Sequence, residues 1–126
     1  IIKLFNIRSK INLHPDPNVE SIKLILEKAK TMVSEWEGSL YFVYIPSIKT
    51  FKKNRDNSYR LKLLEVIHDL EIPVIDIYSY IISNHPEPLT LFPFQISTHY
   101  NADGYKLISN EIIQKISSYD NKNKIN

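Results

Sequence analysis

The sequence predicts an α/β fold whose strands are parallel. Residues 40–45 form a continuous apolar run rich in Tyr, Phe and Val, as in a strand that is covered on both faces. Residues 73–77 form a second short strand, and residues 59–70 between the two runs carry apolar side chains at helical spacing. A strand, a helix and a strand with connections of this length form a βαβ unit. The two strands should therefore be parallel and the crossover right-handed.

The composition narrows the class of protein. The chain has 126 residues, which corresponds to one domain or part of one, and its hydrophobic share of 43% is enough for a core. The net charge of +2 is too small to indicate a nucleic-acid partner, and no apolar run reaches the roughly 18 residues that span a bilayer. Because the chain has no cysteine and its four histidines show no ligand spacing, we expect no metal and no cofactor. This composition fits any compartment.

The start of the chain indicates missing sequence. Residues 1–8 contain neither a methionine nor a signal peptide, and they read as an amphipathic segment. We therefore expect the natural polypeptide to begin earlier. A sheet of about two strands also has exposed edges and cannot bury helices on both faces. The complete sheet should be larger, through self-association or through pairing with missing N-terminal sequence.

The first helix is expected at residues 19–36, after a breaker at residues 13–18 that contains two prolines. Asn18 is the expected N-cap, and Gly38, one of two glycines, is the expected stop. One face of the helix should be buried, with Trp36 in the core. The apolar positions of that face are Ile22, Ile25, Ala29, Met32, Val33 and Trp36.

The later elements follow from similar signals. Pro46 ends the first strand, and Ser58 is the expected cap of the helix at residues 59–70. The inward-facing residues of that helix are Leu63, Leu64, Ile67 and Leu70. Residues 78–84 have room for a helical turn or two. Residues 89–94, which include a proline, are expected to form an apolar loop that packs on the surface or lines a pocket.

Residues 97–105, Ser-Thr-His-Tyr-Asn-Ala-Asp-Gly-Tyr, hold the most informative pattern. Asn101 can cap a helix whose first turn contains Asp103, a charge that complements the helix dipole. The apolar series of this helix is Tyr105, Ile108, Ile112 and Ile116. His99 lies two residues before the cap, so its backbone should be held in place. Spacing alone leaves two interpretations open: an ordinary loop histidine, or an imidazole held in one orientation for chemistry.

Two further polar residues lie at the predicted strand ends. Ser47 follows the first strand, and Asp76 lies near the end of the second. Open α/β sheets bind ligands at the carboxyl ends of their strands. Ser47 could contact a substrate or simply begin a polar loop. Asp76 could pair with a histidine or bind a neighbouring loop.

The chain resembles the SGNH (GDSL-type) hydrolases at several of these positions. Residues 89–110 look like the last block of that family, in which the catalytic histidine precedes an Asn-x-x-Gly helix start. His99, Asn101 and Gly104 match this pattern. The segments similar to the family's last two core strands are residues 40–47 and 72–77.

The resemblance implies a fold and a domain division. It spans about residues 19–118, and it implies a three-layer α/β/α fold with a flavodoxin-like parallel sheet. Residues 1–118 would be the C-terminal part of such a domain, with about two of its core strands. Residues 119–126 would be a polar tail.

The resemblance also implies that His99 is the general base of a serine ester hydrolase. The family's Gly-Asp-Ser nucleophile block and its oxyanion blocks do not occur in this sequence. The aspartate usually found two or three residues before the histidine is also missing, because Ser97 and Ile96 stand there. The acid partner is then Glu87 or Asp76; otherwise a hydroxyl or a backbone carbonyl orients the imidazole.

Two hypotheses about function follow. In the first, the chain is the C-terminal part of an ester hydrolase that acts on a small ester or an acylated sugar. Asn101 and Gly104 then support the histidine, while Ser47 and Phe94 contact the substrate. In the second, the chain is a catalytically inactive α/β binding or assembly module, and residues 89–94 form an exposed apolar contact surface. A Gly-Asp-Ser element in upstream sequence would favour the first.

Overall fold

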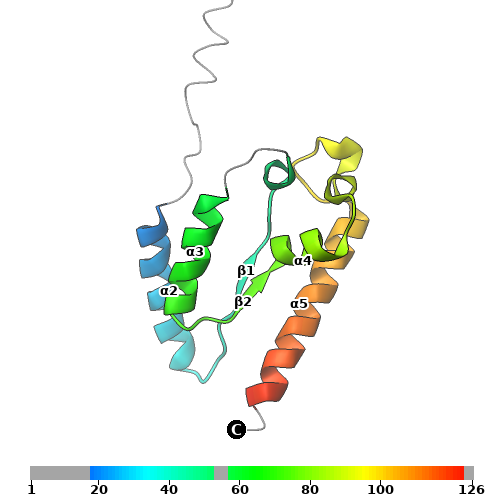
Figure 1. Cartoon of the computed structure of the whole chain (residues 1–126). Helices are drawn as coiled ribbons and strands as arrows, with labels where there is room; N and C mark the ends of the chain where they lie inside the picture. The colour runs from blue at the N-terminus through cyan, green and yellow to red at the C-terminus, as the bar shows by residue number, and fades with distance from the viewer. Residues whose placement is uncertain (1–17, 53–56, 124–126) are drawn as a thin grey trace, which may run out of the picture.

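Two parallel strands lie at the centre of the computed structural model, which describes residues 18–52 and 57–123 (Figure 1). β1 (Phe42–Tyr44) pairs with β2 (Val74–Asp76), and the register places Tyr44 opposite Asp76. The predicted parallel α/β arrangement is confirmed. The amphipathic segment expected at residues 1–8 lies outside the described residues.

Helices α2 (Val19–Ser34) and α3 (Ser58–Asp69) cover one face of the sheet. The buried centre of this layer consists of Leu63, Ile67 and Ile72. The partly buried side chains around it are Ile22, Leu26, Leu40, Phe42, Tyr44, Tyr59, Leu70 and Val74. Because side chains alternate along a strand, Phe42 and Tyr44 face this layer and Val43 faces the other.

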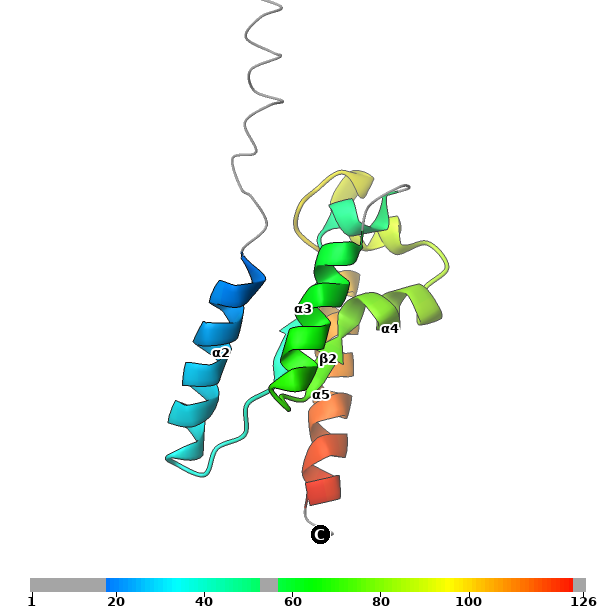
Figure 2. The ribbon, with the colours of Figure 1, turned by 60° about the vertical axis from the view of Figure 1, so that its left-hand side comes forward.

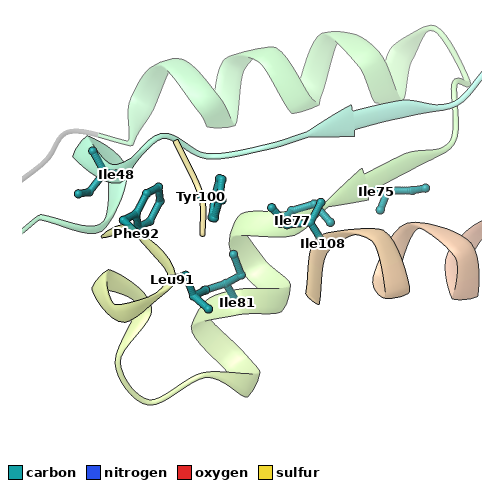
Figure 3. Packing of buried hydrophobic residues seen from close by; sticks show 8 residues of the cluster. All are labelled: Ile48, Ile75, Ile77, Ile81, Leu91, Phe92, Tyr100 and Ile108. Carbon is teal, nitrogen blue, oxygen red and sulfur yellow. The ribbon is translucent and has the colours of Figure 1, made fainter. Parts of the chain in front are cut away.

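Helices α4 (Ile77–Asn84) and α5 (Ala102–Asn123) lie on the opposite face, together with two short 3₁₀ turns at Pro88–Leu91 and Pro93–Gln95. Figure 3 shows the buried cluster between these elements. Its members are Ile48, Ile75, Ile77, Ile81, Leu91, Phe92, Tyr100 and Ile108. This larger part of the core holds the loop that leads into α5.

Helix α5 extends beyond its apolar series, whose last member is Ile116. It continues to Asn123, so the domain boundary expected at residue 118 falls inside a helix. The Tyr119 hydroxyl donates to the Val74 carbonyl at 3.1 Å, and the Tyr41 hydroxyl donates to Asp120 at 2.6 Å. These two bonds fasten the late turns of α5 to β2 and to the residue before β1.

The predicted burial of α2 is wrong on one side of the helix. Trp36, placed in the core from the sequence, is 71% exposed, and Ile25 and Met32 are more than half exposed. The helix packs on α3 through Ile22, which belongs to the predicted face, and through Leu26, which does not. Figure 2 shows α2 at the outer margin of its layer, away from α5. The apolar stripe of α2 is wider than the surface on which the helix packs, so its spacing does not specify which edge of the stripe is buried.

Two helix termini differ from the expectation by one to two residues. The Gly38 N–H donates to the Val33 carbonyl at 3.0 Å, but the left-handed residue of this turn is Glu37, with φ of 56°. Gly38 therefore follows the left-handed residue and does not occupy that position itself. The helix ends at Ser34, two residues earlier than predicted. At the start of α3, Asn57 is the N-cap and Ser58 is the first helical residue.

Candidate functional site

His99 lies on the loop between the second 3₁₀ turn and α5, and its side chain is exposed. Its backbone N–H donates to the Ser97 Oγ at 3.1 Å, and the Ser97 N–H donates to the Pro93 carbonyl at 3.2 Å. Ser97 stands at a position where the SGNH pattern can have an aspartate. Its hydrogen bonds hold the backbone of the loop. Within the described part of the chain, no hydrogen bond or ion pair involves the imidazole of His99.

Asn101 anchors the other end of the loop in two directions. Its Oδ1 accepts from the Gly104 N–H at 2.9 Å, which confirms the predicted N-cap of α5. Its Nδ2 donates to the Thr90 carbonyl at 2.8 Å, and its backbone N–H donates to the Leu91 carbonyl at 2.9 Å. The residue two places after His99 is therefore fixed to the helix and to the neighbouring 3₁₀ turn.

Gly104 has a packing role that the sequence does not reveal. A Cβ atom at this position would lie 2.8 Å from the Leu91 carbonyl oxygen and 2.7 Å from the Tyr100 ring. The glycine lets the first turn of α5 approach the chain at Leu91 closely. Its match to the SGNH pattern thus coincides with a steric requirement of this loop.

Tyr100 joins the His99 loop to the loop after β1. Its hydroxyl donates to the Pro46 carbonyl at 2.6 Å, and its ring lies 4.3 Å from the Phe92 ring, centroid to centroid. Burial raises the pKa of the Tyr100 phenol well above its usual range, and the nearby Tyr44 and Tyr105 raise it further. Because Pro46 precedes Ser47, the segments that carry His99 and Ser47 lie next to each other.

Asp76 has a different partner from the histidine suggested by the sequence. Arg60 binds both of its oxygens, through Nε at 3.3 Å and through a second, closer bond from Nη2. The Ser79 hydroxyl donates to the same carboxylate at 2.6 Å, and Asp76 also caps α4. Asp76 therefore links β2, α3 and α4 through its side chain.

The other predicted site residues lie in separate environments. The Ser47 hydroxyl lies 3.5 Å from that of Thr50. Phe94 projects into solvent, with 92% of its surface exposed. Glu87 is exposed at the edge of an open groove of about 570 Å³. The residues that line this groove are Phe51, Lys52, Glu87, Pro88, Leu89, Thr90 and Gln95.

Arg60 is a buried charged residue that the sequence pattern did not single out. Its side chain is 8% exposed, and its guanidinium carbon lies 4.6 Å from the centre of the Tyr78 ring and 5.7 Å from that of Tyr44. A signal was present, because Arg60 lies three and seven residues before the buried Leu63 and Ile67. Helical spacing puts it on the inward face of α3, where a cation requires a partner such as Asp76.

The described residues contain no group of three or more histidine, cysteine, aspartate or glutamate side chains that could hold a metal ion. Among the helices of that part, none is both long and apolar enough to cross a bilayer. Comparison with family models, curated proteins and solved structures finds no match to this chain. Any assignment of activity therefore depends on the chemistry of the residues themselves.

Proposed function

We propose that this chain is the part of an SGNH-type serine ester hydrolase that carries the general base. The complete protein would have a three-layer α/β/α fold, and β1 and β2 would be two strands of its larger sheet. The observation that supports this most is the setting of His99. Its imidazole is exposed, while its backbone is held by Ser97 on one side and by the capped start of α5 on the other. A general base needs this combination of access and fixed position.

The proposed chemistry is proton transfer by His99. The imidazole takes the proton from a serine hydroxyl as that oxygen attacks the ester carbonyl, and then gives the proton to the leaving alcohol. The serine and the oxyanion donors would come from sequence outside this chain. Because Arg60 binds Asp76, the remaining candidates to orient His99 are Glu87, a hydroxyl and a backbone carbonyl. Ser47, on the adjoining loop, is proposed to contact a small ester or acylated-sugar substrate.

The test uses the polypeptide that contains both this chain and a Gly-Asp-Ser block. His99→Ala should lower its ester turnover by roughly two to four powers of ten, because the general base is lost. His68→Ala, which removes an exposed imidazole from the flank of α3, is the matched control and should leave turnover unchanged. Retained turnover in His99→Ala would end the assignment.

This chain alone should hydrolyse p-nitrophenyl acetate no faster than an ordinary exposed histidine does. The reason is that it lacks the nucleophile block. Turnover that Ser47→Ala abolishes would show instead that Ser47 is a nucleophile.

A catalytically inactive α/β binding or assembly module is the second candidate, and one observation favours it. The buried Arg60 neutralises Asp76, so the carboxylate closest to the strand ends serves the structure and not a histidine. Labelling of the longer polypeptide with a serine-directed phosphonate separates the two candidates. Labelling that depends on His99 supports the hydrolase, and absence of labelling supports the module.

A further inference from the structure

Phe94 is an aromatic side chain that projects into solvent from a left-handed backbone. It is 92% exposed, and Ile96 beside it is 74% exposed. Phe94 and Gln95 both have left-handed backbones, with φ of 53° and 58°. The Gln95 N–H donates to the carbonyl of Phe92, whose own ring is almost fully buried. Such strained conformations persist only where the surroundings impose them and are concentrated at functional sites.

A groove adjoins the backbone of the residue that follows Phe94. Gln95, the residue after Phe94, lines it together with the apolar Phe51, Pro88 and Leu89. Its volume of about 570 Å³ leaves room for an aromatic side chain. The turn that carries Phe51 and the turns that carry Leu89 and Phe94 meet at the same end of the molecule (Figure 1). The surface therefore carries a projecting apolar side chain next to an apolar groove.

The groove also carries one charge of each sign. Lys52 and Glu87 both line it, and neither forms a salt bridge with any residue in the described part of the chain. A surface with a projection, a groove and both charges can be complementary to itself. A two-fold symmetric dimer needs this property, because the same patch of each subunit must face the other.

We propose that this surface binds a second copy of the chain, so that Phe94 of each subunit enters the groove of the other. Lys52 then faces Glu87 of the partner subunit, and the same pair occurs again across the two-fold axis. Exposed aromatic anchors that fill a pocket commonly dominate the energetics of such interfaces. This assignment gives Phe94 a role other than the substrate contact predicted from the sequence. It extends the assembly-module hypothesis, in which residues 89–94 form an exposed apolar contact surface, and its test measures association and not activity.

Sedimentation velocity of the full chain over a range of concentrations tests the proposal. The wild-type mass should rise from that of one chain to that of two. Phe94→Asn should raise the dissociation constant at least about tenfold, because it removes the ring. Asparagine tolerates the left-handed backbone, so the loop is preserved. Ile113→Gln, which changes a 62% exposed residue on α5 to an amide, is the matched control and should leave dimerisation unaltered.

A charge swap tests the geometry of the interface. Lys52→Glu and Glu87→Lys should each weaken the dimer, since each places like charges opposite one another. The double variant Lys52→Glu/Glu87→Lys should restore it. Circular dichroism of every variant shows whether the fold is retained.

Three results would overturn the proposal. The first is a wild-type monomer at about 100 µM, a concentration at which even a weak specific dimer forms. The second is a dimer that Phe94→Asn leaves intact. The third is a dimer that Trp36→Gln abolishes, which would place the interface on the exposed face of α2.

Discussion

Arg60 holds both carboxylate oxygens of Asp76 and thereby ties the first turn of α3 to the carboxyl end of β2. The Ser79 hydroxyl bridges the two side chains, donating to Asp76 and accepting from Arg60 at 2.7 Å. Both charged side chains are largely buried. A pair with supporting hydrogen bonds offsets the desolvation of its charges, whereas either charge alone would not be compensated.

Asp76→Asn should therefore destabilise the fold strongly, because the buried guanidinium of Arg60 loses its counter-charge. We expect the free energy of unfolding, measured with urea, to fall by about 3 kcal/mol. Glu71→Gln is the control, since it breaks the exposed Lys30–Glu71 pair and should cost less than about 1 kcal/mol. If the double variant Arg60→Met/Asp76→Asn is no more stable than Asp76→Asn, the lost counter-charge is not the cause.

The contrast between Asn101 and Arg60 shows which features the sequence can predict. The cap at Asn101 depends on residues within one helical turn, so its pattern is visible locally. The parallel strands are likewise predictable, because two short apolar runs flank one helix. Arg60 depends on Asp76, which lies 16 residues away on another element. Helical spacing places Arg60 on the inward face of α3, but it does not identify this distant partner.

Trp36 and Phe92 show a second limit, which concerns apolar side chains. Trp36 reads as core and is exposed, whereas Phe92, in a segment expected as a loop, is almost fully buried. Burial is favourable for any apolar side chain, but the surface available for packing decides which apolar side chains are buried. The same limit applies to the site, where the adjacency of the His99 and Ser47 loops depends on the Tyr100–Pro46 bond.

Tyr100 should make the stability of the fold sensitive to high pH. Its folded pKa is raised, mainly by burial, so the folded state keeps the proton after the unfolded state has lost it. The stabilisation is complete below the unfolded pKa of about 10 and is lost as the pH rises toward the folded pKa. The free energy of unfolding should fall above about pH 10, by up to roughly 1.4 kcal/mol per pH unit from this group.

Tyr100→Phe tests this explanation because it removes the ionisable group and keeps the ring. At pH 7 it should cost about 1 kcal/mol, since the Pro46 carbonyl loses its donor. Above about pH 10 the loss of stability with pH should be shallower than in the wild type. Tyr105→Phe removes only the smallest of the three causes of the raised Tyr100 pKa and should make the alkaline slope only slightly shallower. Equal alkaline slopes in wild type and Tyr100→Phe would contradict the assignment.

Gly104→Ala should destabilise the start of α5. The new methyl group would lie too close to a backbone oxygen and a buried ring. Crowding of this kind costs about 1–3 kcal/mol of stability. Alanine gains up to about 1 kcal/mol in helix propensity, so we expect a net loss of about 1–2 kcal/mol in urea unfolding. At Gly38 a Cβ atom would lie 2.9 Å from the Val33 Cγ1 and 3.3 Å from the Val33 carbonyl oxygen, a looser backbone contact than at Gly104, so Gly38→Ala should cost less than Gly104→Ala. Similar losses at both glycines would argue against close approach as the reason.

A single substitution at Asn101 can remove one of its two side-chain hydrogen bonds and keep the other. Asn101→Asp keeps the acceptor for the Gly104 N–H but replaces the donor to the Thr90 carbonyl with an oxygen. It should cost about 1 kcal/mol, whereas Asn101→Ala, which removes both bonds, should cost about 2 kcal/mol. Both losses can be measured by urea unfolding.

Asn18 supplies the matched comparison, because at α2 its side chain only caps, accepting from the Glu20 N–H at 3.1 Å. Asn18→Asp should therefore be nearly neutral, since aspartate and asparagine cap equally well, and Asn18→Ala should cost about 1 kcal/mol. If Asn101→Asp proves as neutral as Asn18→Asp, the bond to Thr90 does not stabilise the loop. The backbone at His99 would then be positioned by the helix cap and Ser97 alone.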